Sequence, residues 1–188
     1  MITSDTHILA ATQHWLTRAV IGLNLCPFAK SVYVKNQIRY VISHSMSPAD
    51  VLTELNTELH YLADADPAQL DTTLMILPDT LADFLDYNDF LGRADRVLKR
   101  ARLTGVLQIA SFHPDYQFSD SEPDAIENFT NRAPYPILHL LREDSIARAV
   151  AAFPDAAAIY ERNQETMRRL GHKGWKAWLA SAGEDSTN

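Results

Sequence analysis

A histidine and a carboxylate stand two residues apart in the segment Ser111-Phe112-His113-Pro114-Asp115-Tyr116-Gln117-Phe118. Residues two apart in an extended chain face the same side, so the imidazole of His113 and the carboxylate of Asp115 could meet one ligand. Two histidines and a carboxylate also make the facial triad that binds iron, and His139 could complete it. The alternative is a histidine that is hydrogen-bonded at a turn, with Asp115 capping the chain that follows.

The single cysteine lies in the segment Asn24-Leu25-Cys26-Pro27-Phe28-Ala29-Lys30. If Pro27 opens a helical turn, Cys26 occupies its N-cap, where backbone N–H groups lower a thiol pKa. Such a thiol would suit a nucleophile, with His113 or His139 as its base. In the competing geometry Cys26 follows the C-terminal end of the first helix, which disfavours the thiolate, or it is a small buried hydrophobe.

Two prolines stiffen the segment Asn131-Arg132-Ala133-Pro134-Tyr135-Pro136. A stiff loop that presents Asn131 and Arg132 is suited to hold a carboxylate or a phosphate, because a guanidinium offers a planar fork of donors. The alternative is that Arg132 pairs with an acidic neighbour and only holds the segment in place, the candidates being Asp115, Asp124 and Glu143.

These segments connect an alternating series of predicted elements. Hydrophobic periodicity and capping residues predict helices over 5–23, 47–63 and 79–103, a short helix from Asp144 and another from Pro154. Strands are predicted over 37–43, 72–77, 106–112 and 137–141, with an irregular segment over 113–136. We expect an α/β or α+β fold, with a small, mostly parallel or mixed sheet of about four strands packed with helices. Both a two-layer arrangement and a doubly wound sheet fit this order.

Length and composition narrow the class of protein. The chain of 188 residues suits a single globular domain over 1–182, with a disordered C-terminal tail over 183–188. A net charge of −7 argues against nucleic acid and against an anionic membrane surface as partners. One cysteine permits no internal disulfide, and the N-terminus lacks the features of a secretory signal. We therefore expect a soluble, cytoplasmic protein.

Four segments together resemble a known family. They are Gly22–Ala29, Ser111–Phe118, Asn131–Pro136 and His139–Glu143, and in this order they are similar to the bacterial domain-of-unknown-function family 1415. The resemblance runs from about Thr12 to Trp178. It implies no activity, but the family's segments contain the residues already singled out. Ala133 stands where the resemblance leads us to expect serine, which suggests that this position is not essential.

The leading hypothesis is a small-molecule enzyme that acts on an anionic or carbonyl-containing substrate. The reactive group would be Cys26 or a metal-bound water, with His113 as acid or base, Asp115 as its orienting partner and Arg132 as the anion clamp. Further substrate-binding candidates are Asn24, Asn131 and Arg142, and a divalent metal ion would be held by His113, Asp115 and His139. Two alternatives are a non-catalytic module that binds a metal or an anion, and a purely structural polar network.

Overall fold

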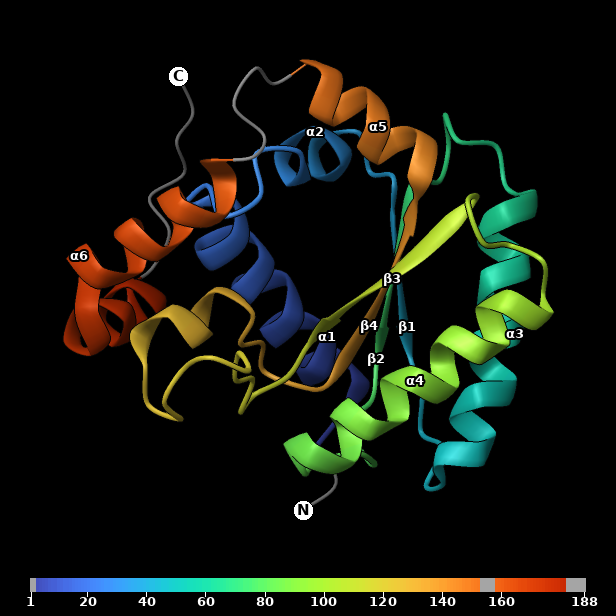
Figure 1. Cartoon of the computed structure of the whole chain (residues 1–188), viewed down its shortest axis with the longest axis horizontal. Coiled ribbons are helices and arrows are strands. Elements are labelled where there is room, and N and C mark those ends of the chain that lie inside the picture. The colour runs from blue at the N-terminus through green and yellow to red at the C-terminus, as the bar shows by residue number, and fades with distance from the viewer. Residues whose placement is uncertain (1–2, 153–157, 182–188) are drawn as a thin grey trace.

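The computed structural model describes residues 3–152 and 158–181, which form a four-stranded sheet with helices on both of its faces (Figure 1). The described helices are α1 (Asp5–Trp15), a π-helix that continues it (η1, Leu16–Ile21), α2 (Ala29–Val34), α3 (Pro48–Asp64), α4 (Phe84–Arg100), a 3-10 helix (η2, Ile126–Thr130), α5 (Glu143–Ala152) and α6 (Ile159–Ala180). The strands are β1 (Ile38–Ile42), β2 (Thr72–Ile76), β3 (Leu107–Phe112) and β4 (Ile137–Arg142).

The sheet is mixed, with the strand order β1-β2-β4-β3. β1 and β2 are parallel, whereas β4 lies between β2 and β3 and is antiparallel to both. β4 follows an irregular segment instead of a crossover helix, and an antiparallel strand needs no such helix. The prediction of a small α+β fold with a mixed sheet is confirmed.

Alternate strand residues face two separate hydrophobic cores. On the first face, here called the α3/α4 face, Met75, Leu138 and Leu140 pack against the apolar stripes of α3 and α4. On the opposite face, here called the cavity face, Leu74 and Ile137 pack with residues of α1, η1 and α6. Figure 1 shows the sheet nearly edge-on between these two groups of helices. The arrangement therefore has three layers, and the two-layer alternative does not hold.

Side-chain caps set where the helices begin. Ser47 accepts a hydrogen bond from the backbone N–H of Asp50 at 3.2 Å, which starts α3 at Pro48 as its sequence predicts. The predicted start of α4 at Asp79 or Thr80 is wrong. Asp83 caps this helix instead, since its carboxylate accepts from the backbone N–H groups of Leu85 and Asp86.

Two further predictions concern the ends of the chain and its hydropathy. The helix start predicted at Pro154 and the tail predicted over 183–188 both lie outside the described residues. Within the described residues, no helix combines the length and the apolar character that crossing a bilayer requires.

Candidate functional site

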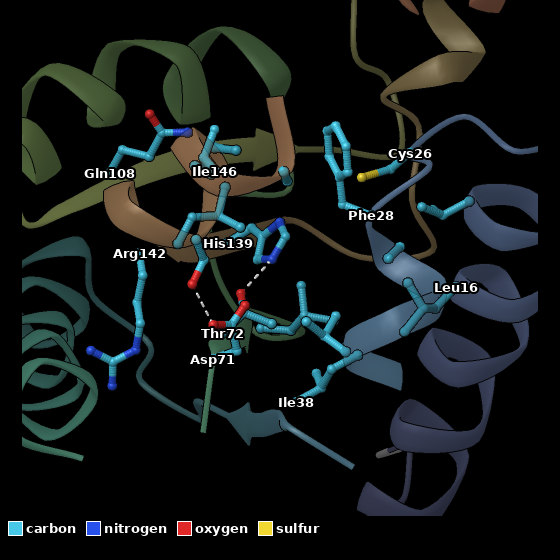
Figure 2. Close-up of a pocket in the computed structure, with 18 of the residues that line it drawn as sticks. Leu16, Cys26, Phe28, Ile38, Asp71, Thr72, Gln108, His139, Arg142 and Ile146 are labelled. Carbon is cyan, nitrogen blue, oxygen red and sulfur yellow. Dashed lines mark hydrogen bonds between the residues drawn. The ribbon is translucent and has the colours of Figure 1, made fainter. Parts of the chain in front are cut away.

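A cavity of about 310 Å³ lies on the cavity face of the sheet, beneath η1, α2 and α5 (Figure 2). Most of its described lining is apolar, including Trp15, Phe28 and Phe112. The π-helix contributes Leu16 and Val20, and such one-turn irregularities are frequent at functional sites. The polar or ionisable residues in the lining are Cys26, Asp71, Thr72, Gln108, His139, Arg142 and Ser145.

His139 projects from β4 into the middle of this cavity (Figure 2). Its Nε2 lies 2.6 Å from Oγ1 of Thr72, and the same hydroxyl donates to the backbone carbonyl of Leu140 at 2.6 Å. Burial lowers the pKa of His139 to about 4, so the ring is neutral at neutral pH. Within the described part of the chain, Nδ1 of His139 has no hydrogen-bond partner.

Cys26 lines the same cavity from the loop that precedes α2. Burial raises the pKa of its thiol, and the backbone N–H groups of Phe28 and Ala29 oppose that shift only in part. No hydrogen bond joins Cys26 to His139, and the Phe28 ring lies between them in the view of Figure 2. The thiol is therefore protonated at neutral pH, and no side chain in the described part of the protein forms a hydrogen bond with it as a base would.

Arg142 and Asp71 are the charged residues in the described lining. The guanidinium of Arg142 points away from His139 (Figure 2) and donates to the carbonyls of Leu62, Ala65 and Leu70 at 2.5, 2.7 and 3.2 Å. It therefore satisfies backbone carbonyls at and beyond the C-terminal end of α3. Asp71 accepts from the hydroxyl of Ser145 at 2.5 Å.

His113 lies on the α3/α4 face, away from this cavity. Its ring packs against Phe84 and Tyr87, with centroids 5.4 and 5.1 Å away. Nδ1 accepts from the backbone N–H of Asp115 at 3.0 Å, and Nε2 donates to the carbonyl of Leu81 at 3.1 Å. Burial lowers its pKa, and both ring nitrogens are occupied within the protein. The arrangement matches the alternative of a histidine hydrogen-bonded at a turn.

Arg132 holds the irregular segment together. Its guanidinium donates to the carbonyls of Tyr116 and Pro123 at 3.2 and 2.7 Å and lies 4.2 Å from the centre of the Phe129 ring. It makes no ion pair with an acidic neighbour among the described residues. Burial lowers its pKa, against the charges of Asp115 and Asp124.

The remaining predicted binding residues also lie outside the cavity lining. The carbonyl of Asn131 accepts from the backbone N–H of His113 at 3.2 Å. Asn24 is exposed and has a left-handed backbone with φ 53° after the first helix. Asp115 is likewise exposed.

The predicted residues thus form two groups on opposite faces of the sheet. Cys26 and His139 line the cavity, whereas His113 and its neighbours in sequence lie at the end of β3. Arg142 also contributes to the cavity lining, but its guanidinium is directed to α3. Because His113 and His139 are on different faces, the facial triad expected from the sequence does not form. Over residues 3–152 and 158–181, no three His, Cys, Asp or Glu side chains are grouped as a metal site requires.

Sequence reasoning missed several residues that shape the cavity, above all Thr72, Phe28 and Gln108. A signal was present for Thr72, since buried hydroxyls usually have a polar partner, but it marks Thr73 equally and does not tell the two apart. No comparable signal marks Phe28 or Gln108, whose positions depend on how α2 and β3 meet in space.

The chain was compared with protein families, curated proteins and solved structures. A family model described as "Protein of unknown function (DUF1415)" matches residues 7–177. No curated protein and no solved structure matches the chain.

Proposed function

Because the chain belongs to the DUF1415 family, whose description names no activity, we propose a function from the cavity: it binds a small, mainly apolar and uncharged organic molecule. The observation that carries this proposal is the presence of a large cavity with an apolar lining. Protein interiors are packed about as densely as organic crystals and leave few voids larger than a water molecule. A cavity of about 310 Å³ lined by aromatic and aliphatic side chains is the usual form of a ligand site.

The size of the cavity indicates the size of the ligand. An engineered apolar cavity of roughly 150 Å³ in another protein holds a benzene molecule. The cavity here has about twice that volume, which suits a bicyclic ring or a substituted benzene.

The charges around the cavity favour a neutral ligand over the anionic one expected from the sequence. Arg142 and Asp71 carry opposite charges at the same end of the cavity, and each is engaged by protein groups. His139 is neutral at neutral pH because of its lowered pKa. A ligand carboxylate would lose its hydration without gaining a free cation, because Arg142 is the one Lys or Arg side chain in the described lining and already donates to backbone carbonyls.

Three probes that share one ring test this proposal: benzyl alcohol, benzoate and benzylammonium. We expect benzyl alcohol to raise the melting temperature in a concentration-dependent manner, because a ligand that binds only the folded state stabilises it. The two ions should have much weaker effects. Calorimetric titration gives the affinities, and a stronger response to benzoate would contradict the neutral-ligand proposal.

Two alanines of α5 supply matched variants for the same experiment. Ala149 lines the cavity, whereas Ala147 is exposed on the same helix. Ala149→Leu should reduce the affinity for benzyl alcohol at least severalfold, since it fills part of the cavity, and Ala147→Leu should leave it unchanged. Equal affinities for the two variants would place the bound molecule elsewhere.

A thiol reaction is the second candidate function. It is favoured by the position of Cys26 in the cavity wall, with the backbone N–H groups of Phe28 and Ala29 directed at its sulfur. The sulfur of Cys26 would then add to the carbonyl carbon of a bound molecule, the C=O π bond would open, and the thiol proton would pass to the carbonyl oxygen to give a hemithioacetal or hemithioketal. The raised pKa of the thiol makes this candidate weaker than simple binding. The cytoplasmic location expected from the sequence stays a prediction under either function.

A further inference from the structure

We infer that the cavity selects molecules that donate a hydrogen bond, such as indoles, phenols and alcohols, and that Thr72 is the residue that sets this preference. The inference rests on the proposed function, because it concerns the ligand of the same cavity. It depends on which nitrogen of the His139 ring carries the proton, and the contacts of Thr72 decide that.

The hydrogen atoms can be assigned from the partners that surround Thr72. A threonine hydroxyl has one hydrogen, and a backbone carbonyl can only accept. The hydroxyl of Thr72 therefore donates its hydrogen to the carbonyl of Leu140, at 2.6 Å. Toward Nε2 of His139, also at 2.6 Å, the same oxygen can only accept, so Nε2 carries a hydrogen.

The other ring nitrogen is then an acceptor. With its pKa lowered to about 4, His139 has a single ring proton at neutral pH, and that proton is on Nε2. Nδ1 presents a lone pair, and no described group of the protein donates to it. Nδ1 is not among the fully buried, unpartnered side-chain nitrogen and oxygen atoms of the described residues. It is therefore accessible from the cavity, where a ligand donor can reach it.

The polarity of the ligand follows from this arrangement. A ligand N–H or O–H can donate to Nδ1, whereas an ether or ketone oxygen would set its lone pairs against that of the ring nitrogen. Replacing Thr72 by valine keeps the shape of the side chain but removes the oxygen that holds the proton on Nε2. The proton can then move to Nδ1, and the ring nitrogen that faces the ligand becomes a donor.

The first test needs no ligand. Long-range ¹H–¹⁵N spectra of protein labelled at its histidines report which ring nitrogen is protonated, and His139→Phe identifies the His139 signals by their loss. We expect the wild type to show the tautomer with the proton on Nε2, and Thr72→Val to show a mixture or the other tautomer. A wild-type His139 with its proton on Nδ1 would overturn the inference.

Thr73 provides the matched control for this variant. It is adjacent to Thr72 and equally buried, but it points to the other face of the sheet, and its hydroxyl oxygen has no partner. Thr73→Val should therefore leave the His139 tautomer unchanged. A shift of equal size in both variants would mean that the tautomer responds to strand packing and not to the Thr72 hydroxyl.

The second test uses indole and benzofuran, two rings of nearly the same shape. Indole has an N–H donor where benzofuran has an acceptor oxygen. By calorimetric titration we expect the wild type and Thr73→Val to bind indole about 5- to 10-fold more tightly, the ratio that one net hydrogen bond supplies. In Thr72→Val and in His139→Phe the two affinities should come within about twofold.

The outcomes separate the inference from the proposal on which it rests. If indole and benzofuran bind the wild type equally well, the cavity binds apolar molecules but does not select donors, and the inference fails alone. If neither binds the wild type, the proposed function fails as well. If Thr72→Val does not fold, His139→Phe still tests whether the preference for indole depends on the ring nitrogen.

Discussion

His113 is buried at the end of β3 and His139 is partly buried within β4, and the two rings differ in which nitrogens are hydrogen-bonded by the protein. In His113 one nitrogen accepts from a backbone N–H and the other donates to a carbonyl. The ring therefore stabilises the backbone, and neither nitrogen is available to a ligand. In His139, the described residues form a hydrogen bond with Nε2 and none with Nδ1. At the scale of a single residue, a ring nitrogen without a hydrogen bond to the protein distinguishes a histidine that can bind a ligand from one with a structural role.

Cys26 allows a direct test of reactivity at this scale. Since burial raises its pKa, we expect native protein at pH 7.5 to react with iodoacetamide at least about tenfold more slowly than the same chain unfolded in urea. Mass spectrometry of samples quenched over time gives both rates, and the chain has no second cysteine to interfere. Saturating benzyl alcohol should slow the native reaction further. A native rate equal to or above the unfolded rate would favour the thiol enzyme.

The C-terminal end of α3 depends on one side chain from a distant strand. Arg142 at the end of β4 donates to three carbonyls, two of them from α3 and its C-cap and one from the turn before β2. The contact joins a helix on the α3/α4 face to a strand that is formed about eighty residues later in the chain. Arg142 therefore holds α3 against β4, although an arginine in this sequence motif suggested an anion-binding role.

We expect Arg142→Met to destabilise the protein by about 2–4 kcal/mol, because it keeps most of the aliphatic stem but leaves buried carbonyls without their charged donor. Urea unfolding followed by circular dichroism measures the change. Arg169→Met is the control, since Arg169 is exposed on α6, and it should change the free energy of unfolding by less than about 0.5 kcal/mol. A loss below about 1 kcal/mol for Arg142→Met would show that water replaces the guanidinium.

The elements themselves are largely predictable from the sequence. The apolar run over Thr72–Leu77 predicts a strand buried on both faces, and β2 is one. The Ser47-Pro48 start of α3 follows from capping chemistry that involves only adjacent residues. Such local signals locate helices and strands well, and they fail where two caps compete, as Asp79 and Asp83 do before α4.

The cavity is less predictable, because it depends on which face of the sheet each strand residue occupies and on what covers that face. His113 and His139 look equally suited to chemistry in the sequence, yet the topology places them on opposite faces. The hydrogen bond between Thr72 and His139 joins residues that are sixty-seven positions apart in the sequence. No spacing within either strand encodes that contact, so the functional interpretation had to await the arrangement in space.

One exposed histidine joins three distant parts of the molecule. His44, in the loop after β1, lies with Nδ1 2.6 Å from a carboxylate oxygen of Asp79 and with Nε2 2.8 Å from one of Asp5. Asp5 begins α1, and Asp79 follows β2. A carboxylate only accepts, so both bonds exist together when the ring is doubly protonated, and the hydrogen bonds to Asp79 and Asp5 raise the pKa of His44.

This contact predicts a pH-dependent contribution to stability. Because the folded pKa is raised, the contribution is fully present below the unfolded value of about 6.5 and is lost as the pH rises through the folded pKa. The difference in melting temperature between wild type and His44→Gln should thus be larger at pH 6 than at pH 9. His60→Gln, at an exposed position of α3, should show a smaller dependence. Equal dependence for both variants would show that the His44 contacts are not maintained in solution.

The insertion of β4 between β2 and β3 has a consequence for biosynthesis. A nascent chain that ends before residue 137 contains β1, β2 and β3 but not the strand that joins β2 to β3. Until the β4 segment has left the ribosome, β3 has no partner strand, so one edge of β2 and both edges of β3 are open to pairing with other chains. The sheet is therefore completed only after β4 has emerged, and we expect the chain to be most prone to aggregation in the period before that.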